Sequence, residues 1–361
     1  MKSFINSFFF IFVSGIGGLL LSLTGFSMGW VIGTLITAAS LSYVRPKWVK
    51  NSLSLKGIPK YWLNIGMYLL GIEIGLQINL AVITAFKEHF FIIFFTLLLS
   101  IIFSLLTGFL LWRTTSLSMM TSFISTTPGG LSVMGGIADD VGANTAVVSI
   151  VQTIRVFMVV CTIPLLLSFT DVHNISLFSS LAATQGENGS FLWLVIFMII
   201  GIGGYFFGKL IRIPAPWLVG TMIGIAITQA VGSSIVNHDL NVWWPPILFI
   251  FAQIFIGASI GSRIRKEMFI GVKRVIALSS LTTIAFISAM MLCSFVVSKL
   301  TNITFTTAAL AFAPGGIAEM STAALLYGAD STFVVAVQVI RVILVCTILP
   351  QLYKILNKKL A

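Results

Sequence analysis

The sequence predicts an all-α polytopic membrane protein, on three observations. Of its 361 residues 58% are hydrophobic and only 9% are charged, whereas about a quarter of the residues in a soluble domain are charged. Uncharged windows such as 91–112 are long enough to cross a bilayer as helices. These apolar runs do not alternate with polar residues, so helices rather than a β-barrel satisfy the backbone in lipid.

The N-terminal segment, the net charge and the cysteines all fit a polytopic membrane protein. Lys2 and the apolar run after it resemble a signal peptide, but no small-residue cleavage site follows, so we expect a first span there. The net charge of +11 is concentrated in short loops beside the spans, which is the positive-inside pattern and argues against a nucleic-acid partner. Cys161, Cys293 and Cys346 lie in apolar runs and are expected to be packing residues.

The two halves of the chain align at a constant offset of 186 positions, which indicates an internal duplication. The matched segments are Pro-Gly-Gly at 128–130 and 314–316, Q-x-x-R at 152–155 and 338–341, and, with a slip of one residue, GWVIG at 29–33 and PWLVG at 216–220. The sequence therefore predicts a first transmembrane repeat at 1–169, an outside linker at 170–189 and a second repeat at 190–361.

Each repeat is predicted to contain five spans and one Pro-Gly-Gly segment. The expected spans lie at about 8–23, 27–43, 61–79, 90–112 and 144–168, and at about 190–207, 214–233, 245–262, 275–298 and 331–353. The Pro-Gly-Gly segments lie at about 116–141 and 303–328. Proline followed by two glycines breaks a helix, so we expect these segments to be discontinuous or re-entrant.

The basic residues decide between two topologies. If each Pro-Gly-Gly segment adds no net crossing, each half has five crossings and the second half is inverted. Every basic residue outside the spans, except Lys87 and Lys299, then faces the inside. If each segment crossed fully, the basic clusters at 209–212 and 263–274 would face outward. We therefore expect two inverted five-crossing repeats, with both termini on the cytoplasmic side.

Inverted repeats with matching broken segments are typical of secondary transporters, in which freed backbone groups bind substrate and ions near the midplane. We therefore interpret both broken segments as substrate-binding. The alternative is a kink that permits close packing of helices. The candidate residues are Thr126, Thr127, Pro128, Gly129 and Gly130 in the first copy, and Pro314, Gly315 and Gly316 in the second.

Arg155 and Arg341 lie near the middle of their spans, where a charged side chain is costly and normally faces the bundle interior or a cavity. Gln152 and Gln338 precede them by three residues and share a helix face with them. The functional interpretation is that these side chains bind an anionic group of the substrate. The structural alternative is an ion pair with an acidic residue, or hydrogen bonds to the carbonyl groups of the broken helices.

The acidic residues of the membrane part differ between the halves, so the shared scaffold does not explain them. Glu319 and Glu73 align with uncharged residues, and they are the first and second candidates for coupling to H⁺ or Na⁺. Asp330, Asp139 and Asp140 are further candidates. They lie near predicted segment ends, where a solvated loop or a helix cap is the more common role.

The doubled Pro-Gly-Gly and Q-x-x-R patterns, with GW-x-x-G and PW-x-x-G, resemble the AbrB family of duplicated membrane proteins, long labelled ammonia monooxygenases. The resemblance covers essentially the whole chain. It implies a bacterial inner-membrane protein, related in architecture to bile-acid symporters and cation/proton antiporters, with a loose link to regulation of gene expression. The broken helices of those folds usually cross the membrane fully, which differs from the topology that the charges favour here.

These features favour secondary active transport of a small, carboxylate-bearing solute, coupled to H⁺ or Na⁺ by alternating access. The alternative is a membrane regulator or sensor that acts without transport, although the longest basic loop, 44–60, is short for an output domain. A monooxygenase needs clustered metal ligands, and the three histidines, at 89, 173 and 238, are far apart in the sequence. We expect no enzyme activity, metal or cofactor. The expected partners are the solute, the coupling ion and the bilayer. The sequence leaves open whether the protein forms a homodimer.

Overall fold

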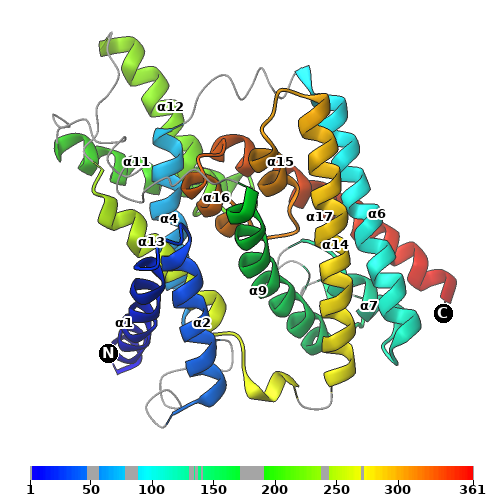
Figure 1. The fold of residues 1–361 in the computed structure, drawn as a ribbon. Helices are drawn as coiled ribbons and strands as arrows, with labels where there is room; N and C mark the ends of the chain where they lie inside the picture. The colour runs from blue at the N-terminus through cyan, green and yellow to red at the C-terminus, as the bar shows by residue number, and fades with distance from the viewer. Residues whose placement is uncertain are drawn as a thin grey trace. The chain divides into compact units, whose positions relative to one another are not determined.

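The computed structural model describes residues 2–46, 57–77, 88–129, 134, 137–139, 141–170, 191–236, 244–269 and 272–360. Within these residues the regular structure is helical and contains no strand (Figure 1). Six helices are long and apolar enough to cross a bilayer: Phe4–Ser22, Phe90–Thr114, Thr145–Phe169, Trp193–Leu210, Lys273–Leu300 and Ser331–Leu349. The predictions of an all-α fold and of a multi-pass membrane protein are confirmed.

The chain forms two compact units. The first consists of Met1–Val82, Asp171–Arg263 and Ser321–Thr332, and the second of Ile83–Thr170, Ile264–Met320 and Phe333–Ala361. The first contains α1 (Lys2–Ser22), α2 (Gly29–Val44), α4 (Lys60–Leu76), α11 (Phe191–Leu210), α12 (Val219–Val236) and α13 (Pro246–Gly261). The second contains α6 (Phe90–Thr114), α7 (Met119–Thr126), α9 (Thr145–Thr170), the 3₁₀ turn η1 (Lys266–Phe269), α14 (Lys273–Leu300), α15 (Phe305–Phe312) and most of α17 (Ser331–Leu360). The unit boundary falls within α16 (Ile317–Leu326).

Each unit therefore takes corresponding helices from both halves of the chain, so the compact units are not the two sequence repeats. The predicted linker at 170–189 lies almost entirely outside the described residues. Four of the ten predicted spans correspond to α2, α4, α12 and α13, which have only 16 to 18 residues. The ten crossings and the inversion of one half stay predictions.

Local structure repeats at the offset that the sequence shows. The bounds of α7 and α15 differ by 186 at both ends. The hydroxyl of Ser118 caps α7 by accepting a hydrogen bond from Thr121 N, and Thr304 caps α15 in the same way through Thr307 N. The two copies thus begin their short helices with the same cap, which satisfies one of the free amides at a helix start.

Both short helices end two residues before the proline of their Pro-Gly-Gly segment, and the residue between is extended. Thr127 (φ −74°, ψ 128°) and Ala313 (φ −54°, ψ 138°) have extended backbone, because a proline ring disfavours helical geometry at the preceding residue. In the second half the chain resumes as α16 at Ile317. In the first half, Gly130 and residues 131–133 lie outside the described residues.

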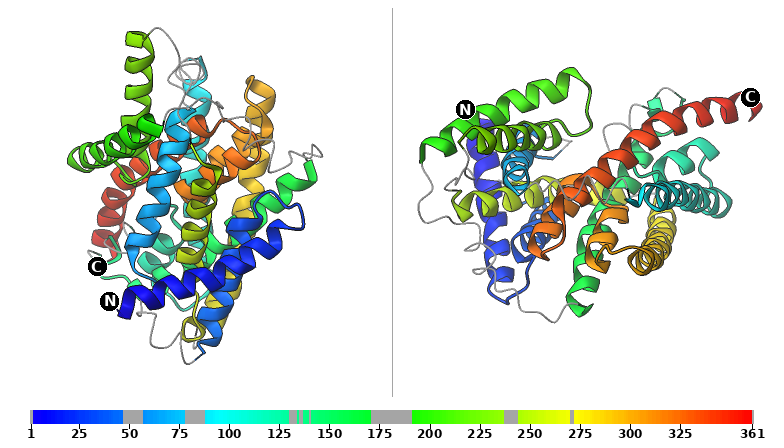
Figure 2. Two further views of the ribbon diagram at one scale, coloured as in Figure 1. Left: turned by 90° about the vertical axis from the view of Figure 1, so that its left-hand side faces the viewer. Right: turned by 90° about the horizontal axis from the view of Figure 1, so that it is seen from above.

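In the first unit, α1 packs against α2, and α11 against α12 (Figure 2), and glycines lie at both contacts. A Cβ atom on Gly33 of α2 would lie 2.2 Å from the carbonyl oxygen of Gly17 of α1. Likewise a Cβ atom on Gly204 of α11 would lie 2.4 Å from Gly220 O of α12. The last glycine of GWVIG and that of PWLVG therefore serve the close helix packing for which small residues are selected in membranes.

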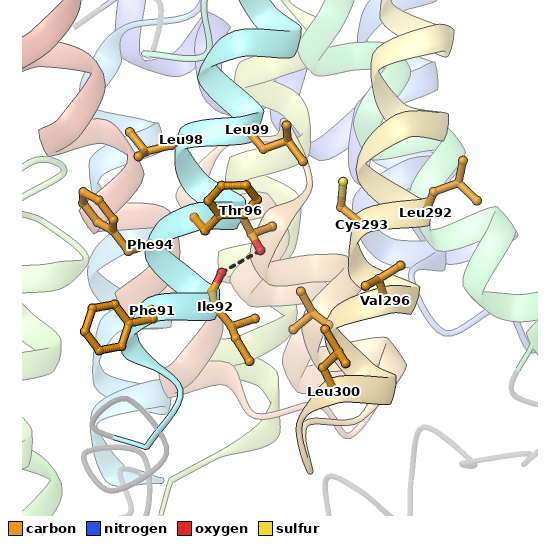
Figure 3. A pocket seen from close by; sticks show the side chains of 12 residues that line it. Phe91, Ile92, Phe94, Thr96, Leu98, Leu99, Leu292, Cys293, Val296 and Leu300 are labelled. Atoms are coloured by element: carbon orange, nitrogen blue, oxygen red, sulfur yellow. Dashed lines mark hydrogen bonds between the residues drawn. The ribbon is translucent and has the colours of Figure 1, made fainter.

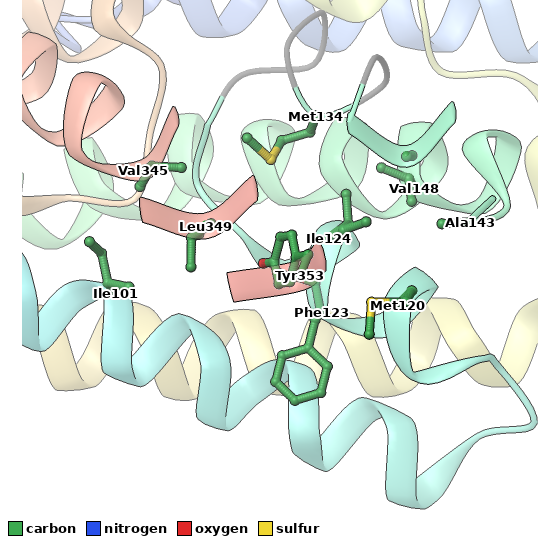
Figure 4. Close-up of a cluster of buried hydrophobic side chains, with 11 residues drawn as sticks. Ile101, Met120, Phe123, Ile124, Met134, Ala143, Val148, Val345, Leu349 and Tyr353 are labelled. Carbon is green, nitrogen blue, oxygen red and sulfur yellow. Dashed lines mark hydrogen bonds between the residues drawn. The ribbon is translucent and has the colours of Figure 1, made fainter. Parts of the chain in front are cut away.

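In the second unit, a buried apolar cluster surrounds Tyr353 near the end of α17 (Figure 4). Its members come from α6, α7, α9, α17 and the segment after the first break: Ile101, Met120, Phe123, Ile124, Met134, Ala138, Ala143, Val148, Val345, Leu349 and Tyr353. The Tyr353 hydroxyl lies 2.6 Å from Thr127 Oγ1 in a buried hydrogen bond. This contact fixes the end of α17 to the first broken segment.

Helices α6 and α14 pack side by side and form an apolar groove of about 740 Å³ (Figure 3). Phenylalanine and leucine side chains of α6 line it together with Leu292, Cys293 and Val296 of α14. The hydroxyl of Thr96 in this groove is already bound to Ile92 O at 2.7 Å. None of the predicted site residues lines the groove, so the candidate site lies elsewhere.

The glycine contacts predict different effects for two neighbouring substitutions. Gly204→Ala should lower the thermal stability of the purified protein, because its methyl group would meet Gly220 O. Gly203→Ala is the matched control, since a Cβ atom there meets nothing within 4 Å. We expect a loss of about 1–3 kcal/mol for Gly204→Ala, measured by thermal unfolding in detergent. Equal melting temperatures for the two variants would contradict the packing described here.

Candidate functional site

The glutamines of the two Q-x-x-R motifs bind the carbonyl groups that the broken helices leave free. Gln152 Nε2 donates to Ile124 O at 3.1 Å and to Thr127 O at 3.3 Å. Gln338 Nε2 donates to the two equivalent carbonyls, Leu310 O at 2.9 Å and Ala313 O at 3.1 Å. Each glutamine thus replaces the amides that a continuous helix would have supplied to its last turn.

Arg341 is bound to the second break through several groups. Its Nη1 donates to Ala313 O, and its Nη2 donates to Gly315 O at 2.8 Å and to Gln338 Oε1. The side chain is only 2% exposed. Arg341 therefore binds the carbonyls on both sides of Pro314.

Arg155 makes a single hydrogen bond to the described part of the chain, from Nη1 to Thr126 O at 2.8 Å. This side chain is 5% exposed. The two guanidinium groups are close enough for their like charges to repel each other. Both Nε atoms are buried without a hydrogen-bond partner. A buried cation that no opposite charge compensates is unfavourable by several kcal/mol.

The structure therefore realises the carbonyl alternative for both arginines. Neither arginine forms an ion pair with an acidic residue of the described part of the chain, which includes Glu73, Asp139, Glu319 and Asp330. Asp140 lies outside the described residues. Binding to broken-helix carbonyls does not neutralise a guanidinium charge, and the substrate interpretation stays a prediction.

The threonines of the first break are buried, and their hydroxyl groups are engaged within the protein. Thr126 Oγ1 donates to carbonyls of its own helix and to Ser104 O at 3.2 Å. Thr127 Oγ1 donates to Phe123 O at 2.7 Å in addition to its bond with Tyr353. Pro128 and Gly129 are also buried. Arg155 is therefore bound by a backbone carbonyl of the first break, whereas the threonine hydroxyls bind other groups of the protein.

Glu319 lies in the first turn of α16, directly after the second break, and is 8% exposed. Its carboxyl folds back to the start of the helix, since a Cβ atom on Gly316 would lie 2.0 Å from Glu319 Oε2. A carboxylate in a first turn is favoured by the helix dipole. The same break thus has Arg341 on its carbonyl side and Glu319 on its amide side.

Glu73 belongs to the first compact unit and lies in the last turns of α4. It is 8% exposed, and its Oε1 accepts a hydrogen bond from Gln77 Nε2 at 3.0 Å. The arginines and Glu319 belong to the second unit. Asp139 and Asp330 are exposed at segment ends, a placement that favours a loop or cap role.

Sequence reasoning missed the contacts that support the breaks from other helices. Ser104 of α6 donates its hydroxyl to Thr126 O at 3.2 Å, and Tyr353 binds Thr127. Met134 and Met320 pack against Gly129 and Gly315 at equivalent positions. The repeat offset contains a signal for the methionines, because 134 and 320 also differ by 186. It contains no signal for Ser104 or Tyr353.

A family profile and one of two relatives carry the same family name. A sequence profile described as "Transition state regulatory protein AbrB" matches residues 30–357. A Bacillus subtilis (strain 168) protein named "Uncharacterized protein YhjN" is 45% identical over 362 residues, covering 99% of this chain and 94% of that protein. An Escherichia coli (strain K12) protein named "Putative regulator AbrB" is 24% identical over 280 residues, covering 76% of each chain.

The hydrogen bonds of Gln338 predict a large stability effect. Gln338→Leu removes both donors to the broken helix and the acceptor of Arg341, so we expect a loss of about 1–3 kcal/mol. Thr347→Val, at an exposed position of the same helix, is the control. Thermal unfolding in detergent measures both variants, and a Gln338→Leu protein as stable as the control would show that the glutamine does not hold the break.

Proposed function

The chain belongs to the AbrB family, and from that premise we propose that it is a secondary active transporter. The proposed solute is small and bears a carboxylate, and its transport is coupled to H⁺ or Na⁺ by alternating access. The observation that carries this proposal is the pair of buried arginines at the two Pro-Gly-Gly breaks, whose charges repel and whose Nε atoms lack partners.

An anion is the ligand that these arginines lack. The described residues of each break supply carbonyl oxygens to them, which accept hydrogen bonds but do not compensate the positive charge. A carboxylate supplies both the charge and two oxygen acceptors, and its hydrogen bonds to guanidinium are among the strongest in proteins.

The arrangement of the chain supports movement of the bound solute rather than permanent binding. Both breaks and both arginines belong to one compact unit, and that unit takes helices from each half. We propose that the halves are inverted in the bacterial inner membrane, with both termini cytoplasmic, so that the breaks approach the midplane from opposite sides. Two pseudo-equivalent halves can then exchange conformations and alternate the access to the site.

Glu319 is the first candidate for the coupling residue. It lies against Gly316 at the break whose carbonyls bind Arg341, so a proton or Na⁺ on its carboxyl changes the charge at the site itself. Glu73 is the second candidate, as a buried carboxyl group in the other unit. The family name and that of the Escherichia coli relative refer to regulation. Regulation could follow indirectly, from transport of a metabolite.

Uptake into proteoliposomes tests the proposal. The wild-type protein should accumulate a carboxylate from a panel of acetate, lactate, succinate and glutamate under an imposed pH or Na⁺ gradient. Glu319→Gln should abolish gradient-driven accumulation, because the side chain can no longer change its charge. Glu88→Gln, at an exposed position before α6, is the matched control.

Two results would count against this function. No accumulation of any panel member by the wild-type protein under either gradient would contradict carboxylate transport. Unchanged uptake in Glu319→Gln would remove Glu319 from the coupling mechanism. A regulatory phenotype in cells that survives both Glu319→Gln and Arg341→Met would favour a regulator that acts without transport.

A further inference from the structure

We propose that the two arginines have different roles: Arg155 binds one carboxylate of the solute through its Nε and Nη2 groups, and Arg341 holds the second break. This division of roles rests on the proposed function for its ligand, but its structural part stands on the hydrogen bonds of each side chain. The two arginines are equivalent in the sequence repeat, but their hydrogen-bond partners differ.

Arg341 has no complete edge left for a carboxylate. A guanidinium group has five N–H donors, with one on Nε and two on each Nη. Both donors of Arg341 Nη2 are used, by Gly315 O and Gln338 Oε1. Its Nε is free, but a two-point contact on that edge needs Nη2 as well. Arg341 therefore acts as a cross-link between Gln338 and both sides of Pro314.

Arg155 keeps that edge intact. Its single bond to the described residues uses Nη1 and Thr126 O. Its Nε is buried without a partner, and no hydrogen bond from Nη2 to the described residues is formed. Nε–H and the adjacent Nη2–H point in parallel, with the spacing of the two oxygens of a carboxylate. The free donors of Arg155 are thus the pair that binds a carboxylate in two-point fashion.

A difference in register separates the two sites. Gln338 donates to the carbonyl of Ala313, and Arg341 binds that same carbonyl. In the first half Gln152 donates to Thr127 O, whereas Arg155 binds Thr126 O, one residue earlier. Arg155 is therefore not tied to the residue before the proline. One free guanidinium edge accommodates one carboxylate, so monocarboxylates should bind as well as dicarboxylates.

Paired substitutions to methionine test this division of roles. Arg155→Met should leave the melting temperature of the ligand-free protein unchanged or raise it, because it removes a buried charge, and Thr126 O keeps its bond to Ser104. Arg341→Met should lower the melting temperature by about 2 °C or more, because Gly315 O loses its donor. Acetate, lactate, succinate and phosphate, each added at millimolar concentration, are the ligand probes.

We expect the carboxylates to raise the melting temperature of the wild-type protein. The rise should disappear in Arg155→Met. In Arg155→Lys, which keeps the charge but loses the paired guanidinium donors, the apparent affinity for the carboxylate should fall at least about tenfold. Equal destabilisation by Arg155→Met and Arg341→Met would overturn the division, whether or not the protein transports. A carboxylate shift that persists in Arg155→Met, or a wild-type shift with phosphate alone, would overturn the assigned ligand. Retained carboxylate binding at Arg155 without gradient-driven uptake would contradict only the transport function.

Discussion

The constraint on which the structure depends is the set of carbonyl groups that Pro128 and Pro314 leave without helix partners. In the apolar part of a bilayer such groups cannot turn to water, so donors must come from within the protein. Gln152 and Gln338 supply these donors from the next long helix of each half. Each arginine lies one turn beyond its glutamine on the same helix face. The glutamine that binds the broken helix therefore places a buried cation beside the break.

The buried cations connect the fold to the proposed function. Carbonyl groups satisfy the donors of a guanidinium group without neutralising it, so an interior in which the described hydrogen-bond partners of both arginines are uncharged is suited to an anion. The two repeats also differ in one hydrogen bond that supports the first break. Thr127 and Tyr353 form a hydrogen bond, whereas their counterparts in the alignment are Ala313 and Leu167. Only the second break has a glutamate in the helix that follows it.

The sequence predicted the class of fold, the long spans and the breaks, because hydropathy and proline act locally. It also placed each glutamine on the same helix face as its arginine, as a spacing of three residues requires. It offered the broken-helix carbonyls as one alternative partner of the arginines but could not choose it, since every residue possesses a backbone carbonyl. Nor could it show that Glu73 and Glu319 belong to different compact units, or that Tyr353 reaches Thr127, because these depend on tertiary packing.

The most direct test of the central claim is an experimental density map of the protein in lipid nanodiscs with a bound monocarboxylate. The account predicts density for the carboxylate against Nε and Nη2 of Arg155, with Arg341 still bound to Ala313, Gly315 and Gln338. A carboxylate bound away from Arg155, or an Arg155 whose Nε and Nη2 donate to protein carbonyls instead, would contradict it.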